Sequence, residues 1–246
     1  MTAAPQQIVL LAAGMGTRLG DLNGGLPKAL FEVAGHKLID LALAFAGRFD
    51  GAERIVVGGF QFDRLSAHLA ASEEQITLLE NPQYRAGNLL TLDVALPSLR
   101  GATLLMNIDH VYPAAVAERI RAQAGEHVTA FVDFDRELGA DDMKVELDGV
   151  RRVRAISKRL DRWDCGYVGM TYIPAGELAR YVATVAAVKA TIGEAAHVEQ
   201  VLQRLADDGA PVEIGDISGI GWHELDTPED VARALPSLRD LAPQLR

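Results

Sequence analysis

A short apolar strand that runs directly into a glycine-rich loop is the feature that most limits how this chain can fold. Residues 8–12, IVLLA, are apolar and few enough for a buried strand, and the loop from Ala13 to about Pro27 contains five glycines. In open α/β sheets, ligands bind where the strands end and such loops begin. The start of the sequence therefore predicts an α/β sheet with a ligand site at one edge.

The rest of the first half predicts the remainder of that sheet. Short apolar runs, expected as strands, alternate with stretches of helical spacing. The expected strands are 54–58, 75–79 and 103–108, and the expected helices are 38–49, 62–70 and 88–96. This alternation predicts an α/β fold with a Rossmann-like, mixed but mostly parallel sheet flanked by helices.

The second half predicts a small β-rich lobe and a closing helix. Expected strands at 143–147 and 150–157 flank Asp148-Gly149, a pair typical of hairpin turns, and the remaining elements are a strand at 166–173 and helices at 178–188 and 198–206. Thr227 and Pro228 predict a helix start, with the threonine as N-cap and the proline in the first turn.

Composition excludes several classes of protein. The net charge of −10 argues against nucleic-acid binding, which needs a basic face. No apolar stretch is long enough to cross a membrane as a helix, and MTAAPQQ lacks the features of a signal peptide. A single cysteine, Cys165, fits a reducing compartment. We expect a cytoplasmic protein with neither nucleic acid nor membrane as partner.

Small residues surround the end of the first strand. Ala12, Ala13 and Gly14 put almost no side chain there, so a flat base or ribose can lie against the backbone beside Leu11. Gly14 and Gly16 permit turns that aim successive backbone amides at phosphate oxygens. We therefore expect this segment to contact a nucleotide.

Two cations follow in the same loop. Arg18 offers a fork-shaped group for phosphate oxygens, and Lys28, after Pro27, is returned toward the same place. A glycine-rich turn with incidental basic residues is the alternative, but the strand, the arginine and the Pro-Lys pair occur together. The loop lacks the GK[ST] ending of a Walker loop and the third glycine of a dinucleotide-binding fingerprint.

LAAGMGTRL followed by LPKALFEVAGHKLID resembles the signature of the nucleotide-sugar pyrophosphorylase-like nucleotidyltransferases. The resemblance implies that the first loop, with Gly14, Gly16 and Thr17, holds the nucleotide. It further implies that Arg18 contacts the departing pyrophosphate and that Lys28 contacts phosphates at the reacting centre.

Asp109 and Asp226 are the candidate metal ligands. Asp109 ends an expected strand at the same sheet edge as the loop, where a carboxylate can hold Mg²⁺ between phosphates; ending a strand or capping a helix is the alternative. The resemblance supports the metal role and implies that Asp226 shares the ion, although Asp226 could instead cap the next helix. Glu224 is a rival ligand, because strand alternation puts it on the same face as Asp226.

Later segments resemble a cytidylyltransferase subgroup. Asn81-Pro82-Gln83-Tyr84 with Gly87-Asn88 is similar to a stretch of cytidylyltransferases that act on phosphocholine-like alcohols, and implies nucleotide contacts from Asn81, Gly87 and Asn88. An Asn88 that caps the following helix is equally compatible. DHVY with SKRLDRWDCG resembles inositol-1-phosphate cytidylyltransferases.

Two lysines in this region are candidates for a phosphate contact. Lys158 is the stronger candidate and Lys144 the weaker, with a solvated surface lysine as the alternative for both. The histidines His36, His110 and His223 lack a metal-ligand spacing and are expected to be structural or peripheral. Cys165 is expected to be a buried filler rather than a nucleophile.

These features together predict a Mg²⁺-dependent nucleotidyltransferase that joins CTP to inositol phosphate, phosphocholine or an aminoalkylphosphonate. A uridylyl- or thymidylyltransferase acting on a sugar 1-phosphate, a non-catalytic nucleotide-binding module and a Rossmann oxidoreductase remain alternatives. We expect one domain over 1–246, with a nucleotide-binding part at about 1–130 and a substrate lobe with its closing segment at about 131–246. A homodimer is compatible with the sequence.

Overall fold

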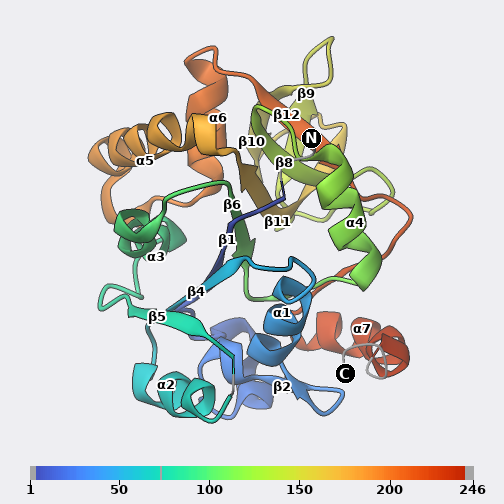
Figure 1. Cartoon of the computed structure of the whole chain (residues 1–246). Coiled ribbons are helices and arrows are strands. Elements are labelled where there is room, and N and C mark those ends of the chain that lie inside the picture. The colour runs from blue at the N-terminus through green and yellow to red at the C-terminus, as the bar shows by residue number, and fades with distance from the viewer. Residues whose placement is uncertain (1–3, 73, 242–246) are drawn as a thin grey trace.

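One mixed sheet runs through the centre of the molecule (Figure 1). The computed structural model describes residues 4–72 and 74–241. The sheet has the strand order β10-β9-β11-β6-β1-β4-β5, with β8 paired to β11 and β12 paired to β8. Its strands are β1 (Gln7–Ala12), β4 (Glu53–Gly58), β5 (Ile76–Glu80), β6 (Thr103–Asn107), β8 (Val128–Asp133), β9 (Lys144–Leu147), β10 (Val153–Ser157), β11 (Cys165–Ile173) and β12 (Val212–Asp216).

The first half of the sheet is parallel. Strand β1 lies between β4 and β6 and is parallel to both, and β4 is parallel to β5. Every residue of β1 is buried because its two faces pack into different cores. Ile8 and Leu10 belong to one core cluster, and Val9 and Leu11 belong to the other. This explains why the strand is a continuous apolar run rather than an alternating one.

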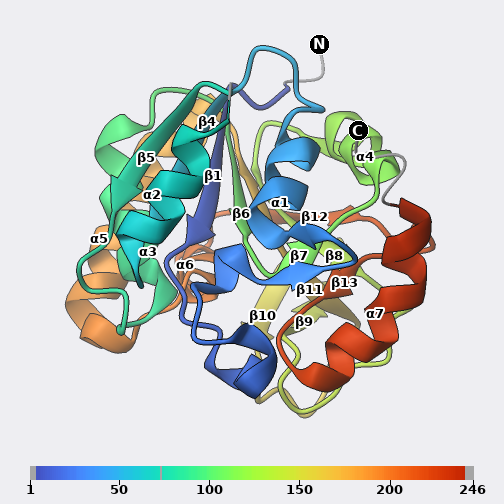
Figure 2. The ribbon, with the colours of Figure 1, turned by 90° about the horizontal axis from the view of Figure 1, so that it is seen from below.

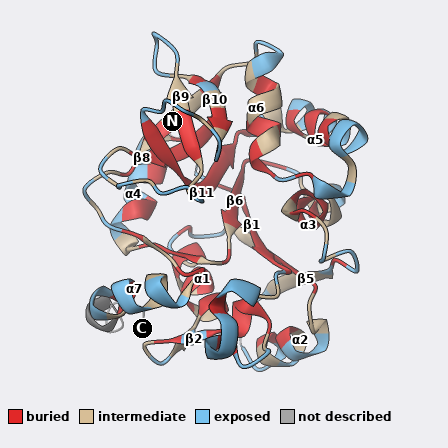
Figure 3. Cartoon of the chain, turned by 180° about the vertical axis from the view of Figure 1, so that it is seen from behind, coloured by how far each residue is buried: buried red, intermediate tan, exposed pale blue. Residues whose placement is uncertain are grey.

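Helices cover both faces of the sheet. Helices α1 (Leu38–Ala46), α2 (Phe62–Ala70), α4 (Ala114–Gln123) and α7 (Pro228–Leu241) contribute to the first core, and α3 (Asn88–Ala95), α5 (Leu178–Ile192) and α6 (Glu199–Asp207) contribute to the second. Figure 3 shows the sheet as the buried layer, with exposed positions on the outer sides of the helices. No helix of the described chain is long and apolar enough to span a membrane.

The predicted α/β fold is confirmed, and its second half extends the same sheet. Strands β9, β10 and β11 join the sheet antiparallel, with β11 beside β6. The hairpin at Asp148-Gly149 is present between β9 and β10. At the start of α7, Thr227 and Asp230 exchange the hydrogen bonds of an N-cap, as expected. Strands β8 and β12, which pair with each other in parallel, were not predicted.

A two-stranded ribbon ties the two halves together beside the central sheet. Strand β7 (His110–Val111) follows β6 directly and pairs antiparallel with β13 (His223–Glu224), as Figure 2 shows. The backbone amide of Leu225 donates to the carbonyl of Asp109 at 2.8 Å. This pairing fixes the end of β6 against the segment that leads into α7, and so brings Asp109 and Asp226 together.

Candidate active site

A cavity of about 850 Å³ opens at the carboxyl ends of β1 and β6. Its wall contains most of the residues proposed from the sequence. These are Leu11, Ala13, Gly14, Gly16, Thr17, Arg18, Lys28, Asn88, Asp109, Lys158, Glu224 and Asp226. The sheet edge predicted from the first loop is therefore the edge that carries the cavity.

Lys28 joins the two aspartates at one point of the cavity wall. Its Nζ lies 2.8 Å from Oδ2 of Asp109 and 2.6 Å from Oδ1 of Asp226. Burial alone would lower the pKa of Lys28, but the two carboxylates outweigh it and raise that pKa above its ordinary value. Arg18 pairs with the other oxygen of Asp226 at 2.6 Å, and its side chain is 57% exposed. Lys28 is thus buried and fixed by its two partners, whereas Arg18 faces the open cavity.

His110 holds the second oxygen of Asp109. Its Nδ1 lies 2.6 Å from Oδ1 of Asp109, and its ring stacks on Trp222 at 5.3 Å. Burial works to raise the pKa of Asp109, but Lys28 and His110 outweigh it and hold that pKa well below its usual range. His110, expected to be structural or peripheral, therefore has a structural role in the cavity wall, where it orients a candidate metal ligand.

The glycine loop places Lys28. The backbone amide of Lys28 donates to the carbonyl of Gly14 at 3.1 Å, which closes the loop on itself. Gly16 has φ of 67°, and a Cβ there would lie 3.1 Å from Cβ of Lys28. Gly14 has open space where its side chain would be. Gly16 is therefore needed for the turn, whereas Gly14 leaves room at the cavity wall.

Three expected nucleotide contacts do not line the cavity. Strand alternation turns Ala12 into the first core, away from Leu11 and Ala13. Asn81 is buried, donating from Nδ2 to Oγ1 of Thr91 at 3.0 Å. Gly87 packs so closely on the chain that a Cβ would lie 2.0 Å from the carbonyl oxygen of Ala196. Ala12, Asn81 and Gly87 thus lie outside the cavity lining, where each is used in packing, and a contact of any of them with a nucleotide stays a prediction.

Asn88 lines the cavity, but its side-chain oxygen already accepts a hydrogen bond from another segment of the chain. Oδ1 accepts a hydrogen bond from the backbone amide of Val198 at 2.9 Å, just before α6. The amide group of Asn88 thus serves the connection between α3 and α6. Oδ1 therefore accepts from a segment distant in the chain instead of capping α3, and a nucleotide contact from the side chain of Asn88 stays a prediction.

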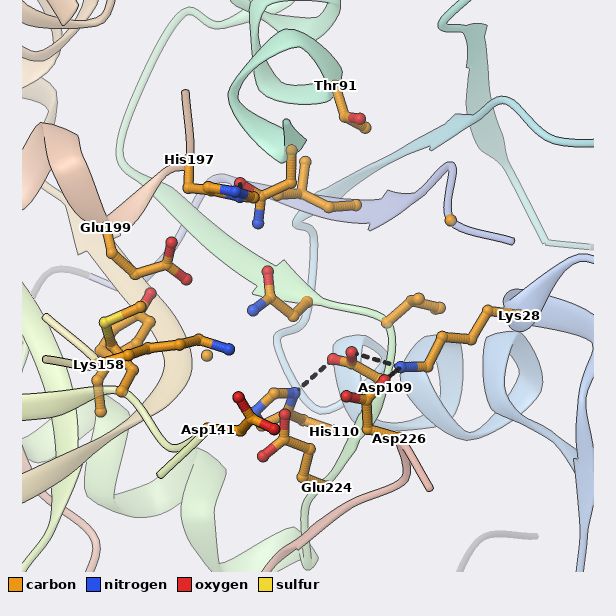
Figure 4. Close-up of a pocket in the computed structure, with 18 of the residues that line it drawn as sticks. Lys28, Thr91, Asp109, His110, Asp141, Lys158, His197, Glu199, Glu224 and Asp226 are labelled. Carbon is orange, nitrogen blue, oxygen red and sulfur yellow. Dashed lines mark hydrogen bonds and ion pairs between the residues drawn. The ribbon is translucent and has the colours of Figure 1, made fainter. Parts of the chain in front are cut away.

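The two candidate lysines differ in position. Lys144 is buried, donates from Nζ to the backbone carbonyl of Lys158 at 2.9 Å, and lies 5.0 Å from the ring centroid of Trp163. Lys144 thus fixes the backbone just after the end of β10 and does not line the cavity. Lys158 lines the cavity, and Figure 4 shows its side chain extending into it from the wall opposite Lys28. Of the two, Lys158 is placed to meet a ligand.

Glu224, the rival metal ligand considered from the sequence, lies in the cavity wall beside groups that the sequence did not single out. Glu224 pairs with Arg136 at 3.5 Å, and Arg136 also lies 4.3 Å from the ring centroid of Trp222. Glu199 and His197 line the cavity from the start of α6. Their positions depend on packing between distant segments, so no local pattern indicated them.

The expected roles of the remaining side chains agree with the structure. Cys165 is buried, and burial raises the pKa of its thiol to about 12, so it is not a reactive thiolate. His223 is half-buried, and burial lowers its pKa. Neither residue lines the cavity.

The carboxylates suit a magnesium ion shared with a ligand. The carboxylates of Asp109 and Asp226 both contact the ammonium group of Lys28. Two carboxylates that converge in this way can also bind a divalent cation. Within the described residues, no group of three His, Cys, Asp or Glu side chains could form a closed metal site. Mg²⁺ is commonly held by one or two carboxylates plus substrate phosphates and water, which matches this sparse donor set.

A glycine-rich loop that faces paired carboxylates at an α/β sheet edge is the geometry expected of a nucleotidyltransferase. Residues 8–209 match the family described as the MobA-like NTP transferase domain, and the chain belongs to that family. The match includes the loop, Asp109 and Lys158, and ends before the segment that supplies Asp226.

Several curated proteins are similar in sequence to this chain over most of its length. A bifunctional IPC transferase and DIPP synthase from Rubrobacter xylanophilus is 30% identical over 227 residues, covering 90% of this chain and 49% of that protein. The chain spans about half the length of the curated relatives that match it over most of its own length.

Two solved structures share the architecture at low identity. The inositol-1-phosphate CTP transferase from T. maritima superimposes with a TM-score of 0.85 at 20% identity, covering 100% of this chain and 98% of that one. The CTP:phosphocholine cytidylyltransferase from Streptococcus pneumoniae gives a TM-score of 0.70 at 18% identity, covering 96% of this chain and 100% of that one.

Proposed function

We propose that this chain is a Mg²⁺-dependent cytidylyltransferase that converts CTP and a phosphorylated small alcohol into a CDP-alcohol type product and pyrophosphate. The observation that carries the proposal is the meeting of Lys28 with Asp109 and Asp226 at the mouth of the glycine loop. The similarity to IPC transferases and to two CTP-using enzymes of the same fold supports CTP and a phosphorylated alcohol as the substrates.

The reaction needs positioning and charge compensation rather than a general base. The acceptor phosphate is already ionised near neutral pH, and one of its oxygens attacks the α-phosphorus of CTP while the bond to pyrophosphate breaks. The electron pair of the broken bond leaves with pyrophosphate, so no proton transfer is required. Lys28 and the exposed Arg18 offset the negative charge that gathers on the leaving group.

The carboxylates of Asp109 and Asp226 would hold the metal on the side of the cavity that contains Lys28 and Arg18. When bound, Mg²⁺ supplies a positive charge between the phosphates of CTP and the two aspartates. Asp109 and Asp226 would hold it, with His110 fixing the orientation of Asp109. Lys158 would contact the α-phosphate or the acceptor phosphate, and its position on the opposite wall of the cavity supports this role.

A substrate panel tests the proposal. The purified chain is incubated with Mg²⁺, each of CTP, UTP, dTTP and GTP, and a series of phosphorylated acceptors, and pyrophosphate is measured. We expect release only with CTP and a phosphorylated alcohol. Release only with glucose 1-phosphate and UTP or dTTP would show a sugar nucleotidyltransferase instead. Nucleotide binding without release under any acceptor would show a binding module.

A further inference from the structure

Glu199 is a buried acid in the cavity wall that no other described residue pairs. It is the first residue of α6, its exposure is 8%, and it lines the cavity. Within residues 4–72 and 74–241, its carboxylate forms no ion pair and receives no hydrogen bond from another residue. A buried acid in a purely structural role would be expected to have such a partner.

The surroundings of Glu199 penalise its charge. Burial raises the pKa of Glu199, and a hydrogen bond from its own backbone amide, followed by His197 and Lys158, opposes that shift without cancelling it. A buried carboxylate that no other residue pairs destabilises the folded state unless water or a ligand in the cavity meets it. A group that carries such a penalty inside a substrate cavity is a candidate for ligand contact.

Glu199 lies on the side of the cavity away from the metal-binding carboxylates. Figure 4 shows Glu199 and Lys158 on one side, and Lys28, Asp109 and Asp226 on the other. A molecule whose phosphate lies near Lys158 therefore extends toward α6. We propose, on the basis of the function proposed above, that Glu199 accepts hydrogen bonds from the hydroxyl groups of a phosphorylated polyol and thereby selects the acceptor.

The composition of this wall favours hydroxyl groups over a cationic head group. Lys158 already supplies positive charge beside Glu199. Recognition of a quaternary ammonium normally uses a cage of aromatic rings. Tyr84 and Tyr167 line the cavity, but Tyr84 packs against Phe60, and no tryptophan or phenylalanine is in the described lining. A polyol can donate to Glu199 and accept from Lys158 at once.

Acceptor preference is the first test. Pyrophosphate release is measured with CTP and Mg²⁺ for inositol 1-phosphate, glycerol 3-phosphate, phosphocholine and 2-aminoethylphosphonate. We expect higher kcat/KM for the two polyol phosphates. A preference for phosphocholine or aminoethylphosphonate would overturn the inference but leave the cytidylyltransferase proposal standing. Absence of release with every acceptor and nucleotide would defeat both.

Glu199→Gln is the second test, because it keeps the size of the side chain and removes its charge. We expect KM for the polyol phosphate to rise by about tenfold or more, the usual scale for losing a charge-assisted hydrogen bond, with KM for CTP unchanged. Glu194→Gln, an exposed acid close in sequence and outside the cavity lining, is the matched control and should leave both constants unchanged.

Thermal unfolding separates recognition from a structural role. Because the Glu199→Gln variant would bury no unpaired charge at this position, its melting temperature at neutral pH should stay the same or rise. The polyol phosphate should raise the melting temperature of the native chain in the presence of CTP, and much less that of the variant. A lower melting temperature, or an unchanged KM for the polyol phosphate, would overturn the assignment of Glu199.

Discussion

Lys28 illustrates at the residue scale how the site balances its charges. Its ammonium lies among the carboxylates of Asp109 and Asp226, and its side chain is only 8% exposed. Buried charges of this kind persist only when they are paired. Arg18, by contrast, pairs with Asp226 from a side chain that is mostly in solvent. In the proposed site, Lys28 would therefore contribute to both stability and chemistry, whereas Arg18 would serve the ligand.

Arg18→Ala should impair nucleotide use without weakening the fold. Losing a charge-assisted contact to a phosphate corresponds to about 2 kcal/mol or more, roughly a 30-fold loss of kcat/KM for CTP. Its exposed ion pair should add little to stability, so the free energy of unfolding should change by less than about 0.5 kcal/mol. Steady-state kinetics and urea unfolding measure the two quantities.

Arg180→Ala is the matched control for this variant. Arg180 has a similarly exposed side chain, at 54%, and its partner Glu177 lies at the start of α5, outside the cavity. The control should leave kcat/KM for CTP unchanged. Equal kinetics for the Arg18 and Arg180 variants would remove Arg18 from the proposed site.

At the scale of single elements, β11 supports the end of the cavity that contains Asp109 and His110 through a backbone irregularity. Gly169 has φ of 71° where the pairing of β11 with β8 shifts register. A Cβ at this position would lie 2.8 Å from the ring of His110. The glycine thus gives His110 the space in which it stacks on Trp222 and holds Asp109.

Gly169→Ala should therefore reduce both stability and turnover. The left-handed φ and the steric overlap together should destabilise the chain by about 1–3 kcal/mol, measured by urea unfolding. Pyrophosphate release should fall as well, because His110 must move away from Asp109. Gly176→Ala, where an added Cβ meets nothing within 4 Å, should be nearly neutral in both assays. Full activity of the Gly169 variant would contradict the role of His110.

Single elements also differ in how well the sequence predicted them. The first strand, its loop and the hairpin at Asp148-Gly149 follow from local patterns, because apolar runs, glycines and turn pairs carry their own signal. Strands β8 and β12 stabilise each other across a long stretch of chain, so neither was recognised alone. Local signals identify elements more readily than their partners.

The residues of the candidate site likewise differ in whether the sequence indicated them. Arg18, Lys28 and Asp109 belong to motifs and could be proposed in advance. His110 and Glu199 became apparent only through their contacts, because an acid at a helix start is usually solvated and an isolated histidine has no ligand spacing. Asn81 and Gly87 show the opposite case, in which residues of a recognisable motif pack within the fold and do not line the cavity wall.

At the scale of the whole molecule, the fold brings distant segments to one sheet edge. The β7–β13 ribbon joins the end of β6 to the start of α7, and the glycine loop closes over both. Two cores, one on each face of the sheet, fix β1 and β6 beneath this edge. We propose that Asp109 and Asp226, which are far apart in the sequence, bind the same Mg²⁺ ion.

A double-mutant cycle on the two aspartates tests that claim most directly. Pyrophosphate release is measured at saturating Mg²⁺ for the native chain, Asp109→Asn, Asp226→Asn and the double variant, with circular dichroism confirming that each is folded. Each single substitution should lower kcat/KM by about 100-fold or more, and the double variant should lose little more than either single variant, because residues that act as a unit are not additive. Losses that multiply, or near-native activity of either single variant, would contradict a shared metal site.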